Sequence, residues 1–243
     1  MSWQVHLEIE RSRPAAPART DRFTIQLDPQ RTVLDAIELV WAKHDPSLTF
    51  RHACHHASCG SCAVVANGVE VLPCVAELQQ VTTNGGTLRI GPLKNFPVVS
   101  DLVVDMAPLF GRMTQVDMPI VGPTPPLAKQ PAHEAGYQAF ENCLECGMCL
   151  SACPVSATNP NYWGPAALAA AYRVYEHGDP ATRNAILNMV DHEDGVWRCH
   201  VAYECSAICP SNVDPAGKIM ALRQAITVRH IKQVFGLKVG AES

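Results

Sequence analysis

The chain has 243 residues, enough for two domains of ordinary size, each with its own core. Its formal net charge of −4 and pI near 6.2 exclude the strongly basic surface of a nucleic-acid-binding protein. Its 11 cysteines are odd in number and a small share of the chain. They therefore exclude a disulfide scaffold and indicate thiols in a reducing compartment or already bound to metal.

The first elements are predicted to be a hairpin followed by a helix. Apolar and polar residues alternate in residues 3–10 and again in residues 23–27, on either side of a proline- and arginine-containing turn. Thr32 is placed to cap a helix that ends by Asp45-Pro46. Apolar side chains recur at helical spacing at Val33, Leu34, Ile37, Val40 and Trp41.

A cysteine loop follows the helix and reads Arg51-x2-Cys54-x4-Cys59-Gly60-x-Cys62, with Cys74 further on. This spacing is typical of plant-type [2Fe–2S] ferredoxins, with Cys54, Cys59, Cys62 and Cys74 as the ligands. Gly60 would let the backbone approach the cluster and donate amide hydrogen bonds to its sulfides. A hairpin over residues 63–71, turned at Asn67-Gly68, would bring Cys74 back beside the loop.

Two histidines, His55 and His56, lie inside this loop. A Rieske-type centre replaces two cysteines with histidines, but here four cysteines already complete an all-thiolate set. The two histidines are therefore predicted to be surface side chains. With a closing strand at residues 88–90, residues 1–98 are predicted to form a β-grasp [2Fe–2S] ferredoxin domain.

The remainder, residues 99–243, is predicted to be an all-α domain of the bacterial ferredoxin type, giving an α+β chain overall. A helical segment is expected over residues 98–106 and a proline-rich connection over 118–131. Further helices are expected at 134–142, at 166–176, at 181–190, and from 215 to about 234. The basic, amphipathic stretch 223–235 is expected to be half buried; contact with lipid or a partner helix is the alternative.

A four-cysteine run, Cys143-x2-Cys146-x2-Cys149-x3-Cys153-Pro154, begins the second half. In bacterial-type ferredoxins the fourth cysteine of such a run ligates the other cluster. The echo Cys199-x5-Cys205-x3-Cys209-Pro210 has Ala202 in place of its second cysteine.

Exchanging the fourth cysteines sorts the seven thiols into two sets. Cys143, Cys146, Cys149 and Cys209 are predicted to hold a [4Fe–4S] cluster, and Cys153, Cys199 and Cys205 a [3Fe–4S] cluster. The second set has a methyl group where the fourth thiolate would stand, and a corner iron without a thiolate is easily absent. Structural zinc is the alternative, but it binds four ligands and seven cysteines do not divide into fours.

This order of clusters resembles the iron–sulfur subunit of the succinate dehydrogenase and fumarate reductase family, also called succinate:quinone oxidoreductases. The resemblance covers essentially the whole chain. Besides the cysteine motifs, similar stretches are Phe96–Met106, Gly164–Leu168, Gly195–His200 and Val213–Pro215.

The resemblance implies an electron-transfer subunit with no catalytic residues for dicarboxylate chemistry. Electrons would pass between FAD in a flavoprotein partner and a quinone, through [2Fe–2S], [4Fe–4S] and [3Fe–4S] in that order. Transmembrane anchor subunits, which can carry haem b, would hold the chain on the cytoplasmic side of the plasma membrane. The sequence agrees, because no apolar run approaches the roughly 20 residues of a spanning helix and the N-terminus lacks a secretory signal.

The resemblance also implies a quinone pocket beside the third cluster, with Pro154, His200 and Ala202 at matching positions. His200 is the candidate for a polar contact or proton relay, since imidazole titrates near neutrality; a surface histidine is the alternative. One stretch departs from the family. Many quinone-reducing members have tryptophans after the fourth cysteine, where this chain has Val155-Ser-Ala-Thr158, with Trp163 further on.

Two other functions fit parts of the pattern. Iron–sulfur subunits of glycolate oxidase or heterodisulfide reductase relatives share the helical ferredoxin part, but they usually carry two complete cysteine runs and the Cys54–Cys74 domain argues against them. A zinc-stapled interaction module without redox function is the alternative from a different class.

Overall fold

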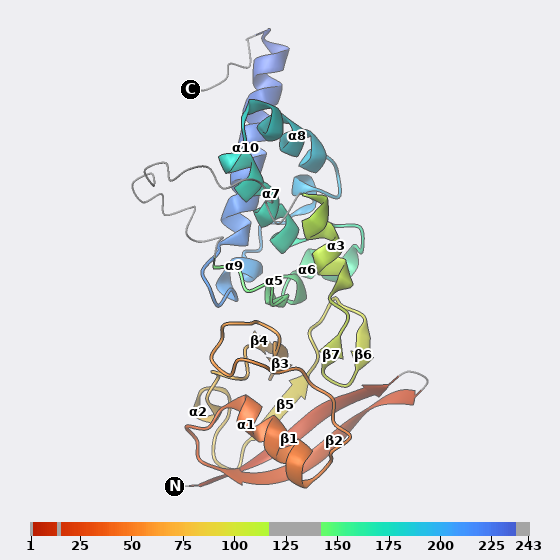
Figure 1. Cartoon of the computed structure of the whole chain (residues 1–243), viewed down its shortest axis with the longest axis vertical. Coiled ribbons are helices and arrows are strands. Elements are labelled where there is room, and N and C mark those ends of the chain that lie inside the picture. Colours follow the sequence, from red (N-terminus) through yellow and green to blue (C-terminus); the bar gives the residue numbers. More distant parts are fainter. Residues whose placement is uncertain (1, 14–15, 117–141, 237–243) are drawn as a thin grey trace. The chain divides into compact units, whose positions relative to one another are not determined.

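The structure is a computed structural model and describes residues 2–13, 16–116 and 142–236 (Figure 1). Contacts group the chain into two units. The sheet unit comprises Met1–Met106 together with Leu144–Ala152, and the helical unit comprises Ala107–Cys143 with Cys153–Ser243. The predicted α+β class is therefore confirmed. The segment Leu144–Ala152, predicted for the second domain, groups with the first unit; the predicted boundary after residue 98 stays a prediction.

A mixed five-stranded sheet forms the first unit, in the order β2-β1-β5-β3-β4. Strands β1 and β5 run parallel, whereas the other pairs are antiparallel. Its strands are β1 (Trp3–Arg13), β2 (Ala16–Leu27), β3 (Val64–Ala66), β4 (Val69–Val71) and β5 (Thr87–Gly91). Parallel neighbours need a crossover, and α1 (Val33–Lys43) lies in this connection as the helix of a β-grasp sheet. A short helix, α2 (Leu78–Val81), was not predicted.

The predicted local signals account for these elements. Alternate residues of β1 are fully buried at Val5, Leu7 and Ile9 and form a core with the buried side of α1. Thr32 caps α1, as predicted: its side chain accepts from the amide of Asp35, and the Asp35 side chain completes a capping box that was not predicted. Trp41, expected on the apolar side of α1, is 47% exposed and packs edge-on against Phe50.

The prediction of a helical segment over residues 98–106 is wrong. Val98–Ser100 (β6) and Val103–Val104 (β7) form a small antiparallel ribbon, and helix α3 begins only at Ala107 and ends at Gln115. Asp101 stands between the strands with φ of 47°, and its backbone N–H donates to the carbonyl of Ser12 over 2.6 Å. Contacts with residues far away in the sequence therefore override the local pattern.

Helices α6 (Pro154–Thr158), α7 (Pro165–His177), α8 (Pro180–Val190), α9 (Glu204–Ala207) and α10 (Pro215–Val234) build the second unit with α3 and a 3₁₀ turn at Val196–Arg198. The starts at Pro165, Pro180 and Pro215 confirm the prediction from helix-opening prolines. The predicted connection over 118–131 and, apart from Asn142, the predicted helix over 134–142 lie outside the described residues.

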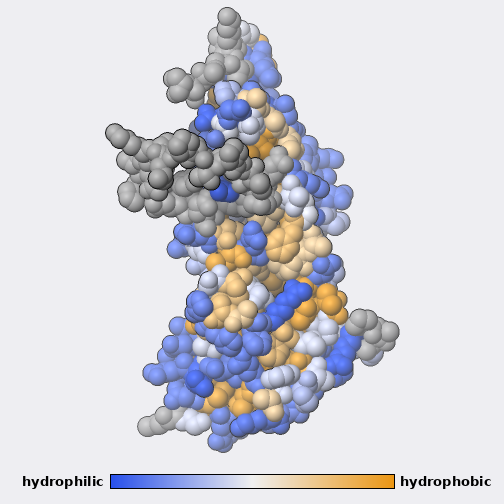
Figure 2. Space-filling model, in the orientation of Figure 1, coloured by the Kyte–Doolittle hydropathy of each residue, from blue (hydrophilic) through white to orange (hydrophobic). Residues whose placement is uncertain are grey.

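Helix α10 is buried mainly in its first half. Its amphipathic stretch 223–235 is less buried than predicted, because only Ile226 and Arg229 of that stretch are buried. Leu222 and Ile226 are fully buried, while Val234 and Phe235 are 81% and 72% exposed. On the face of the sheet unit drawn in Figure 2, hydrophilic residues predominate and apolar ones are scattered among them. No helix among the described residues is both long enough and apolar enough to cross a membrane.

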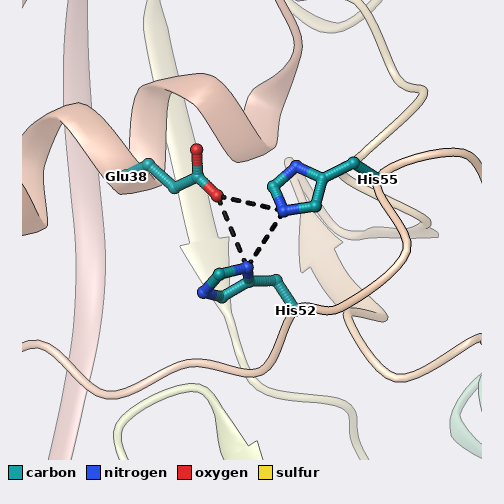
Figure 3. Close-up of side chains that lie close together, drawn as sticks. All are labelled: Glu38, His52 and His55. Carbon is teal, nitrogen blue, oxygen red and sulfur yellow. Dashed lines mark hydrogen bonds and ion pairs between the residues drawn. The ribbon is translucent and has the colours of Figure 1, made fainter.

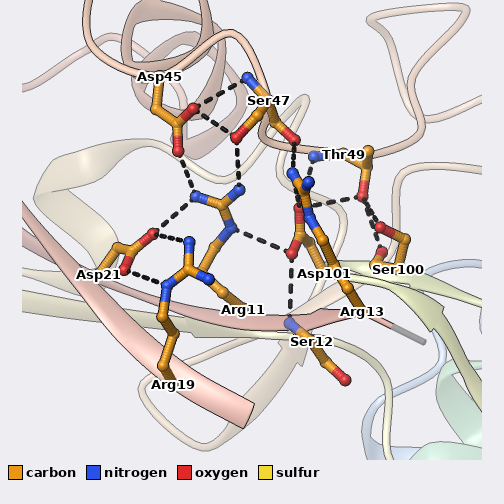
Figure 4. Close-up of polar contacts among 10 residues, drawn as sticks. All are labelled: Arg11, Ser12, Arg13, Arg19, Asp21, Asp45, Ser47, Thr49, Ser100 and Asp101. Atoms are coloured by element: carbon orange, nitrogen blue, oxygen red, sulfur yellow. Dashed lines mark hydrogen bonds and ion pairs between the residues drawn. The ribbon is translucent and has the colours of Figure 1, made fainter. Parts of the chain in front are cut away.

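A buried ion-pair network stabilises the sheet unit (Figure 4). The Arg11 side chain is 1% exposed, and its guanidinium lies 2.8 Å from Asp21, 2.5 Å from Asp45 and 3.1 Å from Asp101. Although burial opposes it, the Arg11 guanidinium lowers the pKa of Asp101 below its usual range. A lowered pKa in the folded state adds stability above about pH 4, and this contribution is lost as the pH falls. The network therefore stabilises the fold at neutral pH.

Replacing Arg11 by methionine should reduce the free energy of unfolding by about 3 kcal/mol or more, because it leaves the fully buried carboxylate of Asp101 with only the half-exposed Arg13, 4.0 Å away, as a cation. Arg19→Met is the matched control, since Arg19 is 54% exposed and pairs only at the surface with Asp21. Urea unfolding followed by circular dichroism measures both variants. Equal decreases in the free energy of unfolding in the two variants would contradict the proposal that the buried network stabilises the fold.

Candidate metal centres

The first group of thiols lies in the loop after α1. Its chain turns back repeatedly, with positive φ at His55, Ala57 and Gly60. As a result, backbone amides point at sulfur: those of Ser58 and Cys59 lie 3.3 and 3.4 Å from Sγ of Cys54. The amide of Ala57 lies 3.4 Å from Sγ of Cys74. Such a concave set of N–H groups suits an iron–sulfur cluster, which carries negative charge on its sulfurs.

The β3–β4 hairpin brings Cys74 back to the loop, as the sequence predicts. Asn67 and Gly68 make the turn with φ of 48° and 88°, and Sγ of Cys62 then lies 3.5 Å from Sγ of Cys74. Both of these thiols are buried, whereas Cys59 is exposed. The structure thus brings the four predicted [2Fe–2S] ligands to one loop and its neighbouring hairpin; their role as ligands stays a prediction.

The pKa values of the loop thiols differ strongly. Backbone amides of His56, Ser58 and Cys59 lower the pKa of Cys54 to about 6, so this thiol ionises readily. Burial raises the pKa of Cys62 to about 12. A buried thiol of this kind becomes a thiolate only when a metal compensates the charge. The readily ionised Cys54 and the buried Cys62 together therefore fit a metal centre at the buried side of the loop.

Gly60 contacts the segment that carries the next two thiols, Cys146 and Cys149. A Cβ at Gly60 would lie 2.6 Å from the carbonyl oxygen of Leu144 and 2.8 Å from Cβ of Cys146. The two cysteine loops therefore touch at Gly60, where there is no room for a side chain. Glycine is required both for this contact and for the φ of +67°.

Within the sheet unit, Ser151 anchors the segment that carries Cys146 and Cys149. It ends helix α5 (Met148–Ser151), which follows the left-handed turn at Gly147. Its hydroxyl donates to the buried carboxylate of Glu70 over 2.8 Å and accepts from the amide of Lys94 over 2.9 Å. Sequence analysis missed Ser151 and Glu70, because a serine after a cysteine motif carries no local signal of a partner 81 residues away.

Cys146 and Cys149 belong to this anchored segment, while Cys143 and Cys209 belong to the helical unit. Sγ of Cys209 accepts from the amide of Val213 at 3.4 Å. The assignment of these four thiols to one [4Fe–4S] cluster stays a prediction.

The third group of thiols lines one cavity of the helical unit. Cys153, Cys199 and Cys205 surround it, and Ala202 contributes to its wall. Positive φ at Val201 and Tyr203 turns the chain back, and the Val201 amide lies 3.4 Å from Sγ of Cys199. Burial and the neighbouring Cys153 and Cys199 raise the pKa of Cys205 to about 12. This is the same combination of curved backbone, amide donors and buried thiol as in the first loop.

Tyr162, which sequence analysis missed, is 1% exposed and lies beside these three thiols. Burial, followed by the charges of Cys199, Cys153 and Cys205, raises the pKa of its phenol. The ring therefore stays neutral and closes one wall of the cavity. Trp163 does not line this cavity. Its indole packs against the His192 ring, with ring centroids 5.5 Å apart.

The three predicted quinone-pocket residues, Pro154, His200 and Ala202, all line the same cavity and are all exposed. The structure therefore brings them together at the solvent side of the third thiol group. Their contact with a quinone stays a prediction.

Gly60→Ala should destabilise the chain much more than Gly68→Ala. Both glycines have positive φ, of +67° and +88°, so each alanine costs roughly 1–2 kcal/mol of backbone strain. At Gly68 nothing lies within 4 Å of the added Cβ, whereas at Gly60 the Cβ collides with backbone. Unfolding midpoints and bound iron, measured on both variants, check this. Equal losses would mean that the close contact at Leu144 is not required.

Family models match both parts of the chain. The 2Fe-2S iron-sulfur cluster binding domain matches residues 6–111, and the 4Fe-4S dicluster domain matches residues 139–213. Among solved structures, a chain of the Mycobacterium smegmatis Sdh1 complex in the apo form superimposes with a TM-score of 0.81 at 23% identity, covering 95% of this chain and 98% of that one. The match to this solved structure supports the fold described above.

Curated relatives carry consistent names. The fumarate reductase iron-sulfur subunit of Haemophilus influenzae is 34% identical over 237 residues, covering 88% of this chain and 90% of that protein. The subunit of the same name from Mycobacterium tuberculosis is 30% identical and covers 96% of each chain. The succinate dehydrogenase iron-sulfur subunit of Paracoccus denitrificans is 31% identical, covering 87% of this chain and 83% of that protein.

Proposed function

The chain belongs to the iron–sulfur subunits of fumarate reductase and succinate dehydrogenase, and we propose that it conducts electrons between FAD in a flavoprotein partner and a membrane quinone. It is the electron-transfer subunit of an oxidoreductase, so the dicarboxylate chemistry takes place in the partner. Its task is to hold redox centres close together and to set their potentials.

The third thiol group carries this proposal. Cys153, Cys199 and Cys205 line one cavity, with Ala202 where a fourth cysteine would complete the motif. Three thiolates fit a [3Fe–4S] cluster. Cys54, Cys59, Cys62 and Cys74 would hold the [2Fe–2S] cluster, and Cys143, Cys146, Cys149 and Cys209 the [4Fe–4S] cluster. These groups supply one-electron redox chemistry when bound, and the chain supplies thiolates, amide donors and burial.

Backbone contact supports the proposed order of the centres. Gly60, between two [2Fe–2S] ligands, lies against Leu144 and Cys146 of the next run. Within that run, Cys149 and Cys153 are proposed ligands of different clusters although only three residues separate them. The proposed [4Fe–4S] run would thus be linked to the [2Fe–2S] loop by contact and to the third thiol group by sequence.

Quinone would bind at the solvent side of the third group. Pro154, His200 and Ala202 line the cavity there and are exposed. The His200 imidazole would donate to a quinone oxygen or relay a proton, because quinone reduction consumes protons and an imidazole ring can both donate and accept them. We further propose that transmembrane anchor subunits, which can carry haem b, hold this side at the cytoplasmic face of the plasma membrane.

Purification from membranes tests the assignment directly. The chain should co-purify with a flavoprotein and hydrophobic anchor subunits, and addition of succinate should reduce its iron–sulfur centres in the paramagnetic resonance spectrum. A purified complex that responds to glycolate or to a thiol instead of succinate would favour the other electron-transfer subunits. Colourless protein that contains zinc and no iron would favour the structural zinc module.

Ala202→Cys should convert the third centre from [3Fe–4S] to [4Fe–4S], because it adds the missing thiolate to Cys153, Cys199 and Cys205. The resonance signal of the oxidised three-iron cluster should disappear, and bound iron should rise by one atom per chain. Ala207→Cys is the matched control, since it adds a thiol in the neighbouring helix α9 at an exposed position. An unaltered three-iron signal in Ala202→Cys would show that the proposed partition of ligands is wrong.

A further inference from the structure

Three side chains outside the proposed iron–sulfur ligands meet on the surface of the sheet unit: Glu38, His52 and His55, here called the surface triad (Figure 3). Glu38 comes from helix α1, and both histidines come from the loop that leads into the first cysteine motif. Their nearest ligand atoms are Oε1 of Glu38, Nδ1 of His52 and Nε2 of His55. Helix and loop thus aim three metal-ligating atoms at one point.

The distances between these atoms match one face of a metal tetrahedron. Nδ1 of His52 lies 3.1 Å from Nε2 of His55, and Oε1 of Glu38 lies 3.6 Å and 3.7 Å from these two nitrogens. Zinc binds nitrogen and oxygen ligands at about 2.0–2.2 Å, which places neighbouring tetrahedral ligands about 3.3–3.6 Å apart. A zinc ion therefore fits between the three atoms with small adjustments of the side chains.

The surroundings hold the ligands in this arrangement. The His52 ring stacks on Phe50, with centroids 5.2 Å apart and planes at 23°, and Trp41 packs edge-on against the same phenylalanine. Glu38 is fixed to the second turn of a capped helix. His55 has φ of 59°, so its backbone turns the ring back toward α1 instead of onward along the loop. Two of the three ligands are thus positioned by packing or by secondary structure.

We propose that the surface triad binds one zinc ion through Glu38, His52 and His55. Two imidazoles and one carboxylate form a donor set that suits zinc, whereas magnesium and calcium require oxygen ligands. The exposed fractions of Glu38, His52 and His55 are 31%, 43% and 50%, so the fourth tetrahedral position is open to water. The site is independent of the proposed function, because none of its ligands is a thiol.

A zinc ion bound by the surface triad would link the cysteine loop to helix α1. His55 directly precedes His56 and follows Cys54, whose thiol accepts the amides of Ser58 and Cys59. A metal bond at His55 would therefore restrict the same backbone that aims these amides at sulfur.

Equilibrium dialysis of the full chain, with its iron–sulfur clusters intact, against zinc chloride tests the proposal. The protein should bind one zinc ion per chain with no loss of iron, and excess magnesium should not displace it. His55→Asn and His52→Gln should each raise the Kd for zinc by at least about tenfold. Loss of a residue that only orients a ligand already lowers metal affinity by about that factor, and loss of the ligand itself should lower it at least as much. Asparagine suits position 55, because it tolerates positive φ and preserves the loop.

Glu38→Gln, which removes the charge and keeps the shape, should also raise the Kd. His44→Gln is the control: His44 is exposed at the end of the same helix and lies outside the triad, so its variant should bind zinc as the wild type does. Absence of zinc binding by the wild-type chain would overturn the proposal. So would an unchanged Kd in both His52→Gln and His55→Asn at full iron content.

Discussion

The contact of Gly60 with the backbone at Leu144 is the constraint on which the arrangement of thiols in the sheet unit depends. It brings one cysteine loop directly against another, and a Cβ would separate them. Ser151 reinforces the contact from the other end of the segment, because its hydroxyl is shared between the Glu70 carboxylate and the Lys94 amide. A conductor of electrons needs its centres close together, and here a missing side chain and one buried hydrogen-bonded serine bring two cysteine loops into contact.

Two separate loops surround their thiols in the same way. In the loop after α1 and in the loop of residues 199–205, positive φ values curve the chain so that amides donate to thiols. In both places one thiol is so deeply buried that its pKa rises to about 12. A thiol of this kind is costly to ionise without a cation beside it. Both loops therefore offer buried, amide-lined surroundings that would suit a bound metal.

Much of this fold can be predicted from local signals. Thr32, the Asn67-Gly68 turn and three helix-opening prolines each act through their own backbone, so sequence alone places them. Cysteine spacing identifies the thiol groups because clusters constrain spacing. The ribbon at β6 and β7 was missed, since Asp101 is held by Arg11, Ser12 and Thr49 from distant parts of the chain. Ser151, Tyr162 and the surface triad were missed for the same reason: their partners come together only in the folded molecule.

The grouping of Leu144–Ala152 with the sheet unit has a consequence for biosynthesis. A chain leaving the ribosome folds its N-terminal part first, at a stage when this segment has not yet been made. Until residues 107–143 have also emerged, Gly60, Phe96 and Glu70 lack the contacts that this segment makes with them. The sheet unit is therefore complete only after more than half of the chain has been translated.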